Sequence, residues 1–311
     1  MNIKNTIIIG TGGVGGYFGF KINEANTNSH YHITFLARQT TYKIIKEKGL
    51  TLLSPEHEKN ITFPDAIIEK CSEISNPDLI LICVKEYDLE NICTQLLSVI
   101  NEKTIFLPLM NGADIYERIR KIIPKNTILP ACVYVASHIK EKGIVEHKGI
   151  TGKIVLGKDP NHPQEDIQWV VSLLKNSGAT VDFQEDAFPA IWTKFMFIAS
   201  FGLVTARYNR PIGDVCQDEL LIQRATAIMQ EIEAIAKMKN IPLAKDVIAA
   251  TFEKAKTFPP STPTSLQLDV NSNKENNELN LFAGAIINYG ETHNINTQHT
   301  QKIYAEIIAK L

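Results

Sequence analysis

A glycine-rich segment near the amino terminus has the residue types and spacing that bind a dinucleotide. Glycines stand at positions 10, 12, 13 and 15, directly after the apolar residues 7–9. Gly10 permits a tight turn, Gly12 lets the backbone approach a pyrophosphate, and Gly15 allows the following helix to pack closely on the strand. The helix N-terminus offers free N–H groups and a partial positive charge to the phosphates. Against the alternative of a simple glycine turn, we predict phosphate binding at Gly10, Thr11, Gly12, Gly13, Val14 and Gly15.

The end of the second β-rich run indicates which dinucleotide binds. An NAD site usually places Asp or Glu there, where the carboxylate accepts the ribose 2′-OH. In this chain the run 32–37 is followed by Arg38 and Gln39, with no acidic residue at that end. A guanidinium can pair with a 2′-phosphate but cannot replace the carboxylate. We therefore predict NADPH as the cofactor, held through Arg38; the alternative is a solvent-exposed arginine without a ligand.

Around these residues, the first half of the chain alternates short apolar runs with amphipathic helical patterns. This alternation is typical of a mostly parallel sheet covered by helices. Residues 79–84 are continuously apolar, as expected of a strand buried on both faces. We predict strands at 6–10, 32–37, 79–84, 104–108, 127–136 and 153–157, a last edge strand at 179–183, and helices at 39–49, 87–100 and 164–177.

The pattern changes near residue 185, because no alternating strand pattern follows it. Helical patterns take over, interrupted by the proline-rich segment 259–263 and the polar segment 271–277. We predict helices at 188–205, 214–238, 243–258, 278–292 and 300–310. The sequence thus indicates two domains, an α/β domain over residues 1–184 and an all-helical domain over residues 185–311.

Composition excludes several classes of protein. The 311 residues carry 32 basic and 34 acidic side chains, a formal net charge of −2, so nucleic acid is not an expected partner. The apolar run at the amino terminus is too short for a secretory signal, and we find no stretch of about 18 apolar residues, so we expect no membrane span. The five cysteines form no CxxC pair, so we expect neither a metal site nor a disulfide framework. These features favour a cytoplasmic protein.

Several segments together resemble the ketopantoate reductase (2-dehydropantoate 2-reductase) family over essentially the whole chain. The resemblance implies a Rossmann-type, doubly wound domain joined to a helical domain, with NADPH and substrate in the cleft between them. It also implies hydride transfer to the keto carbon of a branched 2-oxo acid, here ketopantoate. The segments are IGTGGVGGYFG (9–19), LAR (36–38), ICVK (82–85), LMNG (109–112), IWTK (191–194), TSLQLD (264–269) and NEL (277–279).

The resemblance also implies roles for single residues. Arg38 matches the ligand of the 2′-phosphate, and Lys85 matches a lysine that lines the cleft on the cofactor side. Asn111 matches an asparagine near the nicotinamide and the substrate. Lys194 matches the catalytic lysine, which also contacts the substrate. Ser265 matches a contact to the substrate carboxylate, and Glu278 matches a catalytic carboxylate that binds the substrate hydroxyl.

The residue types alone leave alternatives open. A ketone reductase must stabilise a developing alkoxide and protonate it, and the ammonium of Lys194 can do both. A lysine with such apolar neighbours either extends its ammonium to solvent or faces a cleft. Asn111 can be an ordinary turn residue, Ser265 a helix cap, and Glu278 an acid in the first turn of a helix.

Two positions depart from the family's pattern. Well-studied members have asparagines four and eight residues after the catalytic lysine, whereas this chain has Ile198 and Gly202. A buried amide that binds a substrate hydroxyl discriminates strongly against analogues that lack the hydroxyl. A related NADPH-dependent reductase of a different 2-oxo acid is therefore one alternative. A non-catalytic NADP(H)-sensing protein is another, and the sequence leaves a homodimer open.

Overall fold

The computed structural model describes residues 3–56 and 60–311. The chain divides into two compact units. The first comprises Met1–Asn111 and Ile115–Ala187, and the second comprises Gly112–Asp114 and Phe188–Leu311.

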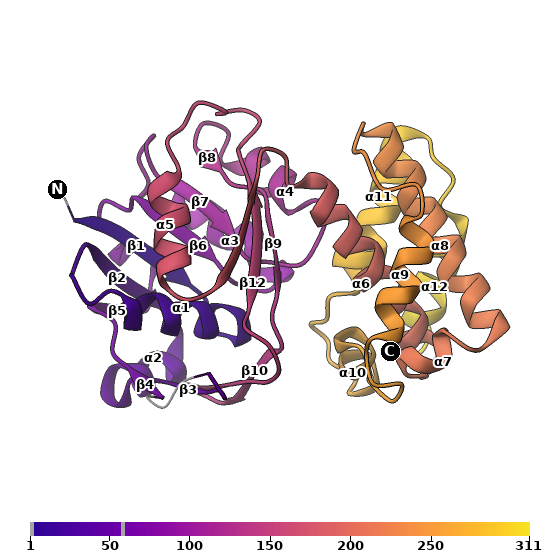
Figure 1. Cartoon of the computed structure of the whole chain (residues 1–311), viewed down its shortest axis with the longest axis horizontal. Helices are drawn as coiled ribbons and strands as arrows, with labels where there is room; N and C mark the ends of the chain where they lie inside the picture. The colour runs from indigo at the N-terminus through magenta and orange to yellow at the C-terminus, as the bar shows by residue number, and fades with distance from the viewer. Residues whose placement is uncertain (1–2, 57–59) are drawn as a thin grey trace. The chain divides into compact units, whose positions relative to one another are not determined.

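The first unit is built on a six-stranded parallel sheet with the order β5-β2-β1-β6-β7-β8 (Figure 1). Every residue of β6 and β7 is buried, because helices cover both faces of the sheet. The winding reverses between β1 and β6, and sheets of this kind bind ligands at the carboxyl ends of the strands beside such a reversal. The strands are β1 (Lys4–Ile9), β2 (Tyr31–Leu36), β5 (Ala66–Ile68), β6 (Leu79–Ile82), β7 (Ile105–Pro108) and β8 (Thr127–Ile128).

The helices of this unit pack in two groups, α1 beside α5 and α3 beside α4 (Figure 1). Their bounds are α1 (Gly13–Ala25), α2 (Gln39–Lys48), α3 (Glu86–Leu96), α4 (Ile115–Ile122) and α5 (Gln168–Asn176). The predicted doubly wound, Rossmann-type sheet is therefore confirmed, although α4 was not predicted.

Two smaller sheets complete the first unit, with the orders β10-β11-β3-β4 and β13-β12-β9. The prediction of one strand over 127–136 was wrong, because Pro130 separates β8 from β9 and the two strands join different sheets. The short strands β3, β4, β5, β10 and β11 were not predicted, since each lacks a long apolar run. The strands are β3 (Leu50–Leu53), β4 (Ile61–Thr62), β9 (Ala131–Tyr134), β10 (Ser137–Glu141), β11 (Ile144–His147), β12 (Lys153–Gly157) and β13 (Thr180–Gln184).

The second unit is helical, and α6 contacts α7, α8, α9, α10 and α12 within it. The predicted helix over 214–238 is interrupted, because the Asp218 carboxylate accepts hydrogen bonds from Leu220 and Leu221 and starts a new helix there. The helices are α6 (Phe188–Tyr208), α7 (Ile212–Val215), α8 (Glu219–Met238), α9 (Val247–Lys256), α10 (Ser265–Asn271), a π-helical turn (Asn280–Gly284), α11 (Ala285–His293) and α12 (Gln298–Ile308).

Helix α6 corrects the expectation that no long apolar stretch exists. Among the described helices it is the one long and apolar enough to cross a membrane, and 61% of that stretch is buried. Its aromatic side chains pack against other helices: the ring of Phe195 lies 6.5 Å from that of Phe282, and Trp192 lies 5.6 Å from Tyr289. A helix that is apolar on all sides is typical of a protein core as well as of a membrane.

Candidate functional site

The glycine loop joins β1 to α1 at the reversal point of the sheet. Gly10 has a φ of +90°, and a Cβ there would lie 2.7 Å from the carbonyl oxygen of Cys83, which follows β6. A Cβ on Gly15 would lie 1.9 Å from the carbonyl oxygen of Gly10. At Gly12, by contrast, the nearest atom to a Cβ would be Ile139 Cδ1, 3.9 Å away. The turn and the packing therefore require Gly10 and Gly15, whereas Gly12 leaves open space at the N-terminus of α1 that suits a pyrophosphate.

This difference between glycines predicts two distinct outcomes. Gly12→Ala should fold with a loss of less than about 1 kcal/mol in unfolding free energy, yet bind NADP⁺ about tenfold or more weakly, because the methyl group occupies the phosphate's place. Gly15→Ala should lower the unfolding free energy by roughly 3 kcal/mol, since its Cβ would overlap the Gly10 carbonyl. Denaturant unfolding and calorimetric titration of both variants measure this, and normal NADP⁺ binding by Gly12→Ala would contradict it.

The thiol of Cys83, beside this loop, is largely protonated at neutral pH. Burial raises the pKa of Cys83 to about 12, so the thiolate is scarce at neutral pH. The same holds for Cys93, whose pKa burial also raises to about 12.

Arg38 follows β2 and directly precedes α2, as the sequence predicts, but its guanidinium is paired. Nη1 donates to Asp88 Oδ1 at 3.2 Å, and Nη2 donates to Oδ2 at 2.8 Å. The hydrogen bonds that the guanidinium donates to Asp88 raise the pKa of Arg38. A second carboxylate, that of Glu69, accepts the backbone N–H of Gln39 at 2.7 Å. The sequence has no acid at the end of this strand, but the structure brings two acids there, Glu69 from the segment after β5 and Asp88 from α3.

A topological signal could have revealed Asp88. It lies in the first turn of the helix that follows β6, and β6 pairs with the opposite side of β1 from β2. The residues that follow β2 and β6 therefore reach the same edge of the sheet. Sequence reasoning missed this acid because it examined only the end of β2.

Lys85 and Asn111 belong to the same edge. Lys85 follows β6 and immediately precedes α3, and Asn111 follows β7. Gly112, with a φ of +120°, turns the chain after Asn111. The structure thus brings the glycine loop, Arg38, Lys85 and Asn111 to the carboxyl edge of one parallel sheet. These are all the residues predicted to bind the cofactor.

In the helical unit, Lys194, Ile198 and Gly202 follow one another at intervals of four residues along α6, so they share one side of it. Lys194 and Ile198 are half-buried, and Gly202 is buried. A Cβ on Gly202 would lie 3.7 Å from the ring of Phe282 and 3.8 Å from Leu266 Cβ. At Gly202, this side of α6 therefore faces α10 and the π-helical turn.

The segments that carry Ser265 and Glu278 meet this side of α6. The hydroxyl oxygens of Thr205, on α6, and Thr264, which precedes Ser265, are 2.6 Å apart. The backbone N–H of Phe282 donates to the Glu278 carbonyl at 3.2 Å, so Glu278 directly precedes the π-helical turn. Such turns occur frequently at functional sites. The structure thus gathers the segments of three of the four predicted substrate residues, Lys194, Ser265 and Glu278, around one helix, whereas the fourth, Asn111, belongs to the first unit.

The structure bears on two of the alternative roles. Thr264, not Ser265, caps α10, because its hydroxyl accepts the backbone N–H of Gln267 at 3.2 Å. Ser265 itself is exposed. Glu278 is only 6% exposed and directly precedes the π-helical turn, a position that agrees with an acid at a helix start. The capping role of Ser265 is therefore wrong, the role of Glu278 as an acid at a helix start stays open, and the roles of both residues toward a substrate stay predictions.

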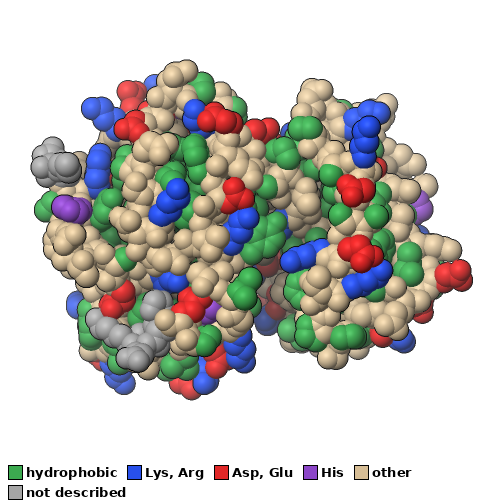
Figure 2. All heavy atoms as spheres, viewed as in Figure 1, with side chains coloured by type: hydrophobic (Ala, Val, Ile, Leu, Met, Phe, Trp, Pro, Cys, Tyr) green, Lys and Arg blue, Asp and Glu red, His purple; other side chains and the backbone are tan. Residues whose placement is uncertain are grey.

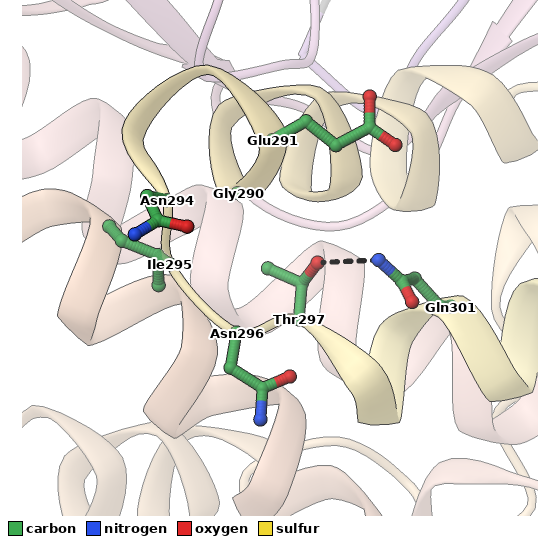
Figure 3. A pocket seen from close by; sticks show the side chains of 7 residues that line it. All are labelled: Gly290, Glu291, Asn294, Ile295, Asn296, Thr297 and Gln301. Atoms are coloured by element: carbon green, nitrogen blue, oxygen red, sulfur yellow. Dashed lines mark hydrogen bonds between the residues drawn. The ribbon is translucent and has the colours of Figure 1, made fainter.

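Other features of the surface do not compete as sites. A cavity of about 290 Å³ lies at the turn between α11 and α12, where Thr297 accepts a hydrogen bond from Gln301 (Figure 3). No residue predicted to bind cofactor or substrate lines it. Figure 2 shows basic and acidic side chains interspersed over the visible face. Within the described ranges, no three His, Cys, Asp or Glu side chains are grouped to hold a metal ion.

Comparison with known proteins agrees with this arrangement. Residues 6–161 match the family model "Ketopantoate reductase PanE/ApbA", and residues 186–310 match the model of its C-terminal part. A 2-dehydropantoate 2-reductase of Streptococcus pyogenes is 23% identical over 97% of this chain and 96% of its own length.

Solved structures share the fold. A PanE/ApbA family ketopantoate reductase from Ralstonia eutropha superposes with a TM-score of 0.87 at 21% identity, covering 99% of this chain and 98% of the other. A D-mandelate dehydrogenase, solved with NADH and anilino(oxo)acetate, gives a TM-score of 0.85 at 20% identity, with coverage of 99% and 98%.

Proposed function

The chain belongs to the ketopantoate reductase family of NAD(P)-dependent oxidoreductases, and from that premise we propose that it reduces 2-dehydropantoate to pantoate with NADPH in the cytoplasm. The observation that carries the proposal is the convergence of the Ser265 and Glu278 segments on the side of α6 that bears Lys194. Residues 1–184 would bind the cofactor, and residues 185–311 would bind the substrate.

Each polar residue then has one task. The open loop at Gly12 and the N-terminus of α1 bind the pyrophosphate, and Arg38 binds the 2′-phosphate. When bound, NADPH would supply the hydride, and thereby the two electrons, that reduce the keto carbon. Lys194 donates the proton that converts the resulting alkoxide to the hydroxyl group. Ser265 holds the substrate carboxylate, and Asn111 and Glu278 hold the remaining polar groups, with Glu278 on the hydroxyl.

A different 2-oxo acid is a second candidate substrate. The residues at positions 198 and 202 of α6 support it. Ile198 and Gly202 supply no hydrogen-bonding side chain on the side of α6 that carries Lys194. Gly202 faces the apolar side chains of Phe282 and Leu266. The fold is shared with a D-mandelate dehydrogenase that was solved with NADH and anilino(oxo)acetate.

A panel of 2-oxo acids tests the proposal directly. NADPH oxidation would be followed with ketopantoate, 2-oxoisovalerate, pyruvate and other branched 2-oxo acids. The highest kcat/KM with ketopantoate supports the proposal, and a clear preference for another acid supports the second candidate. Tight NADPH binding without turnover of any acid would instead indicate a non-catalytic sensor.

Position 198 gives a sharper test of substrate choice. Ile198→Asn should raise the ratio of kcat/KM for ketopantoate over 2-oxoisovalerate about tenfold, because the amide can bind the hydroxyl that 2-oxoisovalerate lacks. The matched control is Ile198→Leu, which has nearly the shape of asparagine without its polar atoms and should leave the ratio unchanged. An unaltered ratio in Ile198→Asn would show that another residue recognises the hydroxyl.

A further inference from the structure

Arg38, the residue predicted to bind the 2′-phosphate of the cofactor's ribose, is already paired with a carboxylate. Both oxygens of the Asp88 carboxylate accept hydrogen bonds from Arg38, at 3.2 and 2.8 Å. This two-point geometry is the strongest arrangement that an arginine and a carboxylate form. The side chain of Arg38 is 51% exposed and that of Asp88 is 27% exposed, so a ligand can reach the pair from solvent.

Two further carboxylates, those of Glu69 and Glu73, lie in the segment that follows β5. Glu69 binds the backbone N–H of the residue after Arg38, and Glu73 in turn accepts the N–H of Glu69 at 3.2 Å. The end of the second strand therefore presents one guanidinium together with the carboxylates of Asp88 and Glu69. A phosphate monoester, which carries a charge of roughly −1.5 to −2 at neutral pH, meets both attraction and repulsion there.

The two forms of the cofactor respond differently to this balance. A 2′-phosphate must share Arg38 with Asp88 and lies close to a like charge. A ribose 2′-OH carries no charge and can donate a hydrogen bond to a carboxylate oxygen, which is the role of the acid in NAD sites. Arg38 thus favours NADPH binding. Asp88 disfavours NADPH binding by repelling the 2′-phosphate, and it can accept a hydrogen bond from the ribose 2′-OH of NADH.

We propose that Asp88 is a specificity-determining residue that weakens the preference for NADPH over NADH through its pairing with Arg38. The inference rests on the proposed function, because it assumes that the cofactor's ribose lies at Arg38. Asp88 comes from α3, the helix after β6. It therefore differs from the acid of ordinary NAD sites, which lies at the end of the second strand. In this chain Arg38 and Gln39 occupy that position.

Calorimetric titration with NADP⁺ and with NAD⁺, which differ only in the 2′-phosphate, tests the proposal without any turnover. Asp88→Asn keeps the shape of the side chain and removes its charge. We expect this variant to bind NADP⁺ about three- to tenfold more tightly than the wild type, a range that an exposed but two-point ion pair supports. Its affinity for NAD⁺ should stay equal or fall, because the amide is a poorer acceptor for the 2′-OH.

A matched control separates local pairing from overall charge. Glu90→Gln makes the same change of charge on an exposed residue of α3 and should leave both affinities unchanged. Equal tightening toward both nucleotides, no tightening, or weaker NADP⁺ binding by Asp88→Asn would overturn the inference and leave the proposed function standing. A wild-type protein that binds neither nucleotide would overturn both.

Discussion

Lys194→Ala is expected to lose about 10²–10⁴-fold in kcat with the best substrate, the contribution that a positioned general acid typically makes. In the proposed mechanism the lysine donates the proton to the keto oxygen, and its positive charge stabilises the alkoxide that develops before the transfer. Alanine provides neither, so a water molecule must supply the proton. Steady-state kinetics over a range of substrate concentrations measures the loss in kcat separately from any change in KM.

The division of the chain makes this prediction specific. Lys194 belongs to the helical unit, whereas the glycine loop and Arg38 belong to the first unit. Lys194→Ala should therefore bind NADPH with nearly normal affinity while turnover collapses. The matched control is Lys245→Ala, which removes an exposed lysine between α8 and α9 of the same unit and should leave kcat unchanged.

Two results would count against the role of Lys194. Near-normal kcat in Lys194→Ala would mean that the proton comes from another group. Loss of NADPH binding together with turnover would mean that the residue maintains the fold. The second result is checked by melting temperature, because Lys194 lies between the buried residues Trp192 and Phe195 of α6.

The main parallel sheet could be predicted because several of its strands are recognisable from their own residues. The β6 strand is a continuous apolar run, and the glycine loop combines three steric requirements in six residues. Helix α6 was predicted for the same reason, since apolar residues recur at helical spacing along it. The strands β3, β10 and β11 escaped prediction because they are short, and β10 is largely exposed with polar residues.

The candidate site was less predictable, because its members meet through tertiary structure. That Asp88 reaches Arg38 depends on the order of strands in the sheet, and no spacing between positions 38 and 88 indicates it. Ser265 could be taken for a helix cap until the structure showed that Thr264 performs that task. The burial of Glu278 likewise depends on the packing of the π-helical turn against α6. Residue identities were thus available from the sequence, but their surroundings were not.

Arg38→Ala is expected to reduce kcat/KM with NADPH by roughly one to two decades, because a charge-assisted contact contributes about 1.5–3 kcal/mol and each 1.4 kcal/mol is a factor of ten. NADH has no 2′-phosphate, so its kcat/KM should stay nearly unchanged and the wild-type preference for NADPH should disappear. Kinetics with both cofactors at a saturating concentration of the same substrate measures the ratio.

Because Arg38 is paired with Asp88, we expect Arg38→Ala to do more than remove the preference for NADPH. Without the guanidinium, the Asp88 carboxylate keeps its charge and has no cation to neutralise it, so it repels a 2′-phosphate more strongly than before. The ratio of NADPH to NADH should therefore fall below one in Arg38→Ala, and the double variant Arg38→Ala/Asp88→Asn should return it to about one, since neither charge then remains. A ratio that stays well above one in Arg38→Ala would place the 2′-phosphate away from this edge of the sheet, and the assignment of Arg38 as its ligand would be wrong.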